Sequence, residues 1–124
     1  MRNRLLGSTV LIATAMLAAA CGSRDVSYAK QVQPILDKNC SECHATGKEG
    51  FTASGLDTTS YEALMKGGKY GALVKAGDAF TSTLNMLVEG RADKSIRMPH
   101  GRNKLADEEN AVLKAWVNEG AKNN

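Results

Sequence analysis

The chain has few aromatic residues and few prolines. Its 124 residues include one tryptophan, three tyrosines, two phenylalanines and two prolines. Aromatic side chains bury the largest apolar areas, so their scarcity limits the core that the chain can build from its own residues. Segments with the alternating pattern of β-strands are also absent, which favours an all-α fold.

No apolar run is long enough to cross a membrane. The uncharged run Leu5–Ala20 is shorter than the ~20 residues that span a bilayer. It follows Arg2 and Arg4 and ends in three alanines before Cys21, which is the layout of a secretory signal peptide. We therefore expect residues 1–20 to be a cleaved signal peptide and the protein to be exported.

An excess of one charge sign is also missing. Removal of residues 1–20 takes away Arg2 and Arg4 and lowers the formal charge from +3 to +1. Such a small excess gives no reason to expect nucleic-acid binding. The remaining residues suffice for one domain, which we place at residues 26–124, and we expect a monomer.

Cys21 directly follows the small residues that end the predicted signal peptide. Its position resembles that in bacterial lipoprotein signals, in which the cysteine becomes the lipidated N-terminus. The alternative is a spare thiol, which is a liability in an oxidising compartment. We expect lipid attachment at Cys21, a tether over residues 21–25, and a membrane anchor on the periplasmic side. In a Gram-negative host Gly22 favours the outer membrane, because lipoproteins kept at the inner membrane commonly have aspartate there.

The most informative segment is Cys40-Ser41-Glu42-Cys43-His44. Two cysteines three positions apart, followed at once by histidine, have the spacing that attaches a haem covalently. The thiols of Cys40 and Cys43 can add to the two vinyl groups, and the His44 imidazole then lies under the iron as its proximal ligand. The expected cofactor is therefore one covalent haem c with its iron, and a buried porphyrin would supply the apolar bulk that the chain lacks.

Two other kinds of site use a Cys-x-x-Cys pair, namely thioredoxin-like redox motifs and structural zinc sites. The redox motif opens a helix within a strand–helix–strand pattern, and this chain has no strand signals. A structural zinc site needs four ligands, whereas only Cys21 and His100 remain outside the motif. A structural disulfide or an incidental match would also account for the pair of cysteines. The haem interpretation is preferred because it alone explains the histidine that follows them.

Met98 is the predicted sixth ligand of the iron. It lies beside Pro99 in an irregular polar stretch, where a thioether is hard to explain as part of a core. Met65 and Met86 fall in helical apolar stripes, in which methionine usually fills gaps. His100 is the competing ligand, and an open sixth position is the third possibility.

Apolar periodicity and capping residues predict the other elements. Val26–Lys38 forms one helical apolar stripe that Pro34 bends or interrupts, and residues 45–55, which are rich in glycine, threonine and serine, indicate a loop. Thr59 is the predicted N-cap of a short helix. Asp78 is the predicted N-cap of another, which runs as far as residue 90.

The last helix has the clearest signals. Asp107, Glu108 and Glu109 crowd its first turn, where carboxylates interact favourably with the helix dipole, and Gly120 stands at its end. Trp116 lies in its apolar stripe. We expect this side chain to be part of the core and to pack the last helix against the first.

The chain resembles small monohaem cytochromes c of the class I type, and in particular bacterial cytochrome c domains with an Arg-Met-Pro segment before a terminal helix that ends in Gly-Ala. The resemblance covers nearly all of the exported region. It implies an all-α, cytochrome c-like fold of three to five helices wrapped around one haem, with the first and last helices crossing near one haem edge. It also places Cys40, Cys43, His44 and Met98 in the family roles. The matching segments are Val32–Leu36, Cys40–His44, Gly55–Leu56, Tyr61–Leu64, Gly77–Asp78, Arg97–Pro99 and Trp116–Ala121.

Two departures from that family concern the iron ligands. Many such cytochromes have a proline after the haem motif, whose carbonyl accepts the other N–H of the ligand imidazole. Pro34 and Pro99 are the only prolines here, so the orienting partner of His44 is not identified. Relatives often have a second proline where His100 stands, which bears on the rigidity of the Met98 loop.

The expected function is electron transfer rather than enzymatic catalysis, with redox partner proteins as donor and acceptor. A haem-based gas-binding or sensor module with a displaceable Met98 is the alternative. A peroxidase is a second alternative, although a dihaem peroxidase would need two attachment motifs and the chain has one. The sequence leaves three roles open for the basic residues between positions 91 and 104: they steer an acidic partner, they pair with haem propionates, or they are merely solvated. They are Arg91, Lys94, Arg97, Arg102 and Lys104.

Overall fold

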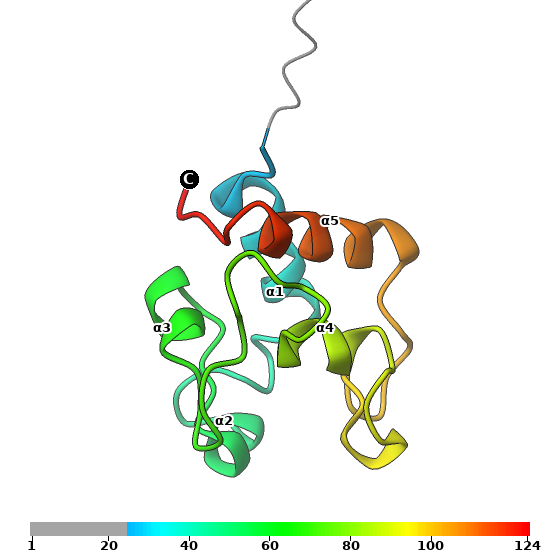
Figure 1. Cartoon of the computed structure of the whole chain (residues 1–124). Helices are drawn as coiled ribbons and strands as arrows, with labels where there is room; N and C mark the ends of the chain where they lie inside the picture. The colour runs from blue at the N-terminus through cyan, green and yellow to red at the C-terminus, as the bar shows by residue number, and fades with distance from the viewer. Residues whose placement is uncertain (1–24) are drawn as a thin grey trace, which may run out of the picture.

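The computed structural model describes residues 25–124, and this part of the chain is helical and contains no β-strand (Figure 1). The all-α, cytochrome c-like fold predicted from the sequence is thereby confirmed. Its elements are a π-helical turn η1 (Tyr28–Val32), α1 (Gln33–Asn39), α2 (Glu49–Ser54), α3 (Tyr61–Lys66), α4 (Thr83–Val88), a 3-10 turn η2 (Lys94–Ile96) and α5 (Asp107–Asn118). The predicted signal peptide, Cys21 and all of the predicted tether except Asp25 lie outside the described residues. No helix between residues 25 and 124 is long and apolar enough to span a bilayer.

The segment predicted as one bent helix is two helical elements that meet next to Pro34. Ser27 caps the first, where its hydroxyl oxygen accepts from the Lys30 N–H at 3.3 Å. Pro34 has no N–H to donate, so it is tolerated in the first turn of α1. Just before it, the Gln33 N–H donates to the Tyr28 carbonyl five residues back, which gives the wider turn of a π-helix.

Trp116 packs α5 against the N-terminal helix, as the sequence predicts. Its side chain is buried and lies against the rings of Tyr28 and Tyr61, with ring centroids 5.4 and 6.4 Å away. Its indole N–H donates to the Lys122 carbonyl at 2.9 Å, so the polar end of the ring is also satisfied. Figure 1 shows α5 crossing α1, and the Ala29 N–H adds a bond to the chain's last carbonyl, that of Asn124, at 2.9 Å.

Two local predictions were wrong. The segment 45–55, predicted as a loop, contains the helix α2. Thr59 was predicted to cap the next helix, but the cap of α3 is Ser60, whose hydroxyl oxygen accepts from the Ala63 N–H at 3.2 Å. Thr59 instead donates its backbone N–H and its hydroxyl to the Asp57 carboxylate. The Thr59 hydroxyl is therefore not used to cap α3.

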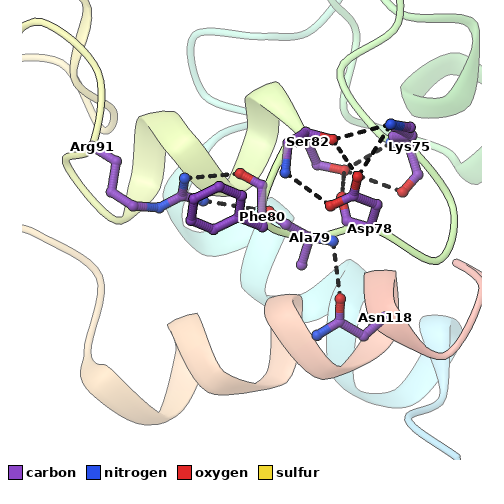
Figure 2. Close-up of polar contacts among 8 residues, drawn as sticks. Lys75, Asp78, Ala79, Phe80, Ser82, Arg91 and Asn118 are labelled. Carbon is purple, nitrogen blue, oxygen red and sulfur yellow. Dashed lines mark hydrogen bonds and ion pairs between the residues drawn. The ribbon is translucent and has the colours of Figure 1, made fainter.

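The turn before α4 is also built differently from the prediction. Asp78 does not cap α4, which begins at Thr83 after the N-cap residue Ser82. Asp78 accepts from the Thr81 N–H at 3.0 Å and its backbone carbonyl accepts from the Ser82 hydroxyl at 2.8 Å. These bonds form a compact turn that precedes the helix (Figure 2).

This turn connects α4, α5 and the start of the Met98 loop. The Ala79 N–H donates to the Asn118 side chain of α5 at 2.9 Å. Arg91 donates to the carbonyl of Phe80 at 2.8 Å and lies over its ring, 5.0 Å from the centroid (Figure 2). Arg91 therefore has partners within the protein, in addition to the three roles that the sequence suggested for the basic residues between positions 91 and 104.

Candidate haem site

The five residues of the haem motif form a tight turn directly after α1. The Cys40 N–H donates to the Leu36 carbonyl at 2.8 Å, and the His44 N–H donates to the Cys40 carbonyl at 2.8 Å. Cys40 is partly buried and Cys43 is exposed, and the two thiols are not joined in a disulfide. The turn therefore brings both cysteines and the imidazole into one short segment of fixed backbone.

The thiol of Cys40 does not have the electrostatics of a reactive cysteine. Burial raises its pKa to about 11, and the negative charges of Glu109 and Asp37 add to the effect. Catalytic cysteines of the thioredoxin type have a lowered pKa, because the thiolate is the reacting form. This difference argues against the redox-motif interpretation of Cys40 and Cys43.

The His44 imidazole is half-buried and is held by the segment that follows it. Burial lowers its pKa, and a hydrogen bond to the backbone of Leu56 acts in the opposite direction. The neutral form that burial favours is the one that can ligate a metal ion. The His44 carbonyl accepts both from the Thr58 N–H at 2.8 Å and from the Thr58 hydroxyl at 3.1 Å, and Thr58 itself is buried.

Helix α2 lies against the motif at Gly50. A Cβ on this residue would come within 2.8 Å of the Cys43 carbonyl oxygen and 3.0 Å of His44 Cε1. The following residue, Phe51, donates its N–H to the same Cys43 carbonyl at 3.1 Å. Only glycine allows the helix to approach the imidazole this closely.

The helix also brings a hydroxyl to the imidazole. Ser54, its last residue, has its Oγ 3.4 Å from His44 Nδ1. The sequence pattern does not single out Gly50 or Ser54, because it favours a loop over the helix that carries them. The usable signal was Glu49 at the start of the segment and Gly55 after its end, a pattern typical of a short helix.

Met98 is partly buried and packs against the hydrophobic core, as does Cys40. Its N–H donates to the Leu87 carbonyl at the end of α4, at 3.2 Å. His100, the competing ligand, is exposed, while Met65 in α3 and Met86 in α4 are partly buried. The Met98 side chain thus combines partial burial with a position outside any helix.

Ion pairs connect the motif to the segments on the Met98 side. Arg102 pairs with Glu42, which lies between the two cysteines. Lys38, at the end of α1, pairs with Glu109 of α5 at 2.8 Å. The backbone turn of the motif is therefore tied through side chains both to the Met98 loop and to the last helix.

A hollow of about 940 Å³ lies beside the motif, between the end of α1, the Met98 loop and the start of α5. It includes neither the motif residues Cys40, Cys43 and His44 nor Met98, so it adjoins the predicted site and is not the site itself. Three of the five residues of the predicted basic rim line it. The lining is Lys38, Asn39, Arg97, Pro99, Gly101, Arg102, Asn103, Lys104, Ala106 and Glu109.

The residues present fit a c-type haem. Two thiols, an imidazole and a thioether are the donor set that such a haem uses. In addition, the Asn85 side chain is fully buried in α4, and both of its amide atoms lack a hydrogen-bond partner within the described residues. A buried amide without a partner is costly, and α4, which contains Asn85, also accepts the Met98 N–H through its Leu87 carbonyl.

Comparisons with known proteins bear on the same region. Residues 40–100 match the family model described as Planctomycete cytochrome C. Among solved structures, the chain is similar to hydrazine synthase of Kuenenia stuttgartiensis, with a TM-score of 0.53 and 22% identity over 77% of this chain and 16% of that one. This likeness concerns the fold alone, and the chain spans about one sixth of that protein's length. The curated protein sequences give no match.

The family match begins at the first cysteine of the motif and runs past Met98. It therefore contains the attachment motif, α2, the Thr58 bonds and Met98 itself, which are the parts of the structure that fit a haem. These findings together support a cytochrome c domain in this chain, with covalently bound haem c and its iron and with haem-based electron transfer as the general function.

Proposed function

We propose that the protein is a one-electron carrier with one haem, attached through Cys40 and Cys43 and ligated by His44 and Met98. The observation that carries the proposal is the geometry of the motif, whose neutral, half-buried imidazole is held by Thr58 and α2. The chain contains one attachment motif, which gives one haem.

Each of these residues has a separate task. The Cys40 and Cys43 thiols fix the macrocycle, and the neutral His44 imidazole offers one ring nitrogen to its metal. Met98 supplies a soft thioether from a partly buried position. The bound haem supplies a ferrous–ferric couple, and a methionine ligand raises its potential. Because His44 and Met98 together would leave the iron no place for a substrate, we infer electron transfer and not catalysis on a substrate.

The hollow beside the motif supports an acidic redox partner. Arg97 and Lys104 line it, and no acidic side chain is ion-paired with either of them in the described part of the chain. Lys38 and Arg102 also line it, but Glu109 and Glu42 already pair with them. Steering by such exposed charges weakens as salt screens them. Electron-transfer rates that do not change between low and high salt would contradict this part of the proposal.

Export and lipid anchoring complete the proposal. Residues 1–20 supply the signal peptide and Cys21 the attachment point, so the carrier would work on the periplasmic side of a membrane. Mass spectrometry of the purified protein tests this directly. A mature N-terminal Cys21 carrying acyl chains is expected, and an unmodified Cys21 would rule out the anchor.

A gas-binding or sensor module is the alternative, and one observation favours it. Among the described residues, the Met98 loop (residues 92–104) makes one backbone hydrogen bond and one exposed ion pair to the rest of the chain, besides the packing of Met98 against the core. These are fewer polar contacts than hold the His44 segment, so we expect the thioether to be displaced more easily than His44. Carbon monoxide separates the two functions. An electron carrier resists the gas in its reduced form at neutral pH, whereas prompt binding would identify a displaceable ligand.

A further inference from the structure

The hydrogen bonds around Ser54 determine which nitrogen of His44 carries the proton. The Ser54 Oγ lies 2.6 Å from the Gly50 carbonyl, 3.2 Å from the Leu56 nitrogen and 3.4 Å from His44 Nδ1. A serine hydroxyl has one proton to donate and two lone pairs that accept. These three neighbours match that capacity completely.

The roles of the three neighbours follow from their chemistry. The Gly50 carbonyl can only accept, so it receives the hydroxyl proton, in keeping with the short distance. The Leu56 N–H can only donate, so it occupies one lone pair. The remaining lone pair faces His44 Nδ1, and only a donor can use it, so Ser54 accepts from Nδ1–H, with the backbone of Leu56 as the competing acceptor.

We propose that Ser54 is the positioning residue of the proximal ligand, accepting the Nδ1–H of His44 and leaving Nε2 free to bind the haem iron. This inference rests on the proposed function, because it assigns a partner to the ligand named there. The residue after His44 is Ala45, not proline. A side-chain hydroxyl thus takes the role that a proline carbonyl has in the family that the chain resembles.

Helix α2 gives this hydroxyl a fixed position. Gly50 contributes twice, since its carbonyl accepts from Ser54 and its missing Cβ lets the helix approach the imidazole edge. The Phe51 N–H bonds the helix to the Cys43 carbonyl. Glycine, serine and the bond to the motif therefore act as one unit that sets the orientation of the His44 ring.

The hydrogen bond from His44 to Ser54 lowers the reduction potential of the haem. An acceptor at Nδ1–H makes the imidazole a more basic ligand, and a more basic ligand favours ferric over ferrous iron. Removing the hydroxyl is therefore expected to raise the potential. The ring also loses a restraint, so its N–H should exchange faster with solvent.

The test compares three variants of the haem-loaded protein. Ser54→Ala removes the acceptor and Ser54→Thr restores a hydroxyl. Thr52→Ala is the matched control, because the Thr52 hydroxyl makes the same bond to the carbonyl four residues back in the same helix, that of Lys48, at 3.0 Å. Two quantities are measured: the reduction potential, and the solvent exchange of the His44 Nδ1–H by nitrogen-15 NMR of the ferrous protein.

The expected pattern is specific to Ser54. Ser54→Ala should raise the potential and speed up Nδ1–H exchange, whereas Thr52→Ala and Ser54→Thr should stay close to wild type in both. An unchanged potential with slow exchange in Ser54→Ala would overturn the inference, since the backbone of Leu56 would then be the acceptor. An equal shift in Thr52→Ala would overturn it as well, because loosening of α2 would explain both.

The inference and the proposed function fail differently. Wild-type protein without covalent haem would overturn both together. A normal haem spectrum and potential in Ser54→Ala would overturn the role of Ser54 alone. If Ser54→Ala does not fold, exchange of the Nδ1–H in wild type and in Ser54→Thr decides the matter, and fast exchange in the wild type contradicts the inference.

Discussion

The two sides of the proposed haem site are held by very different parts of the chain. On the histidine side, Thr58 fixes the His44 backbone and α2 supports the ring. On the methionine side, the polar contacts of residues 92–104 with the rest of the described chain are the bond from the Met98 N–H and the ion pair of the exposed Arg102, and Met98 also packs against the core. The imidazole is thus held by a set of hydrogen bonds and by a close helix, whereas Met98 is held by one backbone bond and by packing.

The largest expected effect is the complete loss of covalent haem when its attachment is removed. In the double variant Cys40→Ala and Cys43→Ala no thioether can form, so covalent haem should be lost completely. Haem staining of a denaturing gel measures this. Glu42→Gln is the matched control, since it changes the residue between the cysteines and keeps both thiols. Retention of covalent haem in the double variant would show that attachment occurs elsewhere.

Removal of Met98 should disrupt the methionine side of the proposed haem site and leave the histidine side intact. In Met98→Ala the ferric protein should lose the far-red absorption band of an iron–thioether bond, and its ferrous form should bind carbon monoxide promptly. The covalent haem and His44 ligation should persist, because the histidine side does not depend on this loop. Met86→Leu should leave the spectrum unchanged, and a band that survives in Met98→Ala would exclude Met98 as the ligand.

Gly50→Ala should damage the histidine side specifically. The new Cβ would meet the Cys43 carbonyl oxygen at 2.8 Å and His44 Cε1 at 3.0 Å, and overpacking of this kind costs about 1–3 kcal/mol of unfolding free energy. Denaturant unfolding of the haem-loaded variant measures the cost. Ala53→Ser, on an exposed position of the same helix, should change stability little. Equal stability of the two variants would contradict the close contact between α2 and His44.

The smallest predicted effect is the loss, in acid, of the contribution that one carboxylate on each side makes to the unfolding free energy. Hydrogen bonds from Thr59 and Thr46 lower the pKa of Asp57 to about 2, and bonds from Ser95 lower the pKa of Asp93. A lowered pKa stabilises the fold above the unfolded value of about 4 and loses its effect as the pH falls toward 2.

Asp93 is exposed and Asp57 is partly exposed, so solvent screening keeps the contributions small. Asp57→Asn should nevertheless lower the unfolding free energy more than Asp93→Asn, because Asp57 bonds to a residue eleven positions away and Asp93 only two. The difference between wild type and Asp57→Asn should be full near neutral pH and disappear below pH ~2. Unfolding curves across this range provide the measurement, and a difference that grows with acid would reverse the assigned sign.

The sequence predicted well those features that depend on local patterns. The last helix and the burial of Trp116 follow from residue spacing alone, and the helical fold was predicted correctly. Helix α2 was missed because glycine, threonine and serine are weak helix formers, so propensity favoured a loop. Tertiary contact with Cys43 and His44 decides this element, and such contact leaves no periodic signal.

Small shifts along the chain account for the remaining errors. Thr59 and Ser60 are both good N-caps, and the choice between them depends on Asp57, which takes both donors of Thr59. The sequence grouped Arg91 with the other basic residues of its segment, because two of its partners, the carbonyls of Phe80 and Ala79, lie in a turn that the sequence did not place. The role of Ser54 depends on three neighbours in space and could be assigned only from the structure.

A potentiometric titration of the haem-loaded protein, followed through its visible spectrum, tests the central claim most directly. One haem with His44 and Met98 on its iron predicts a single reversible one-electron transition, with low-spin, six-coordinate spectra at both ends. A protein that shows no haem absorption, or whose iron is high-spin and five-coordinate in either state, would contradict the account.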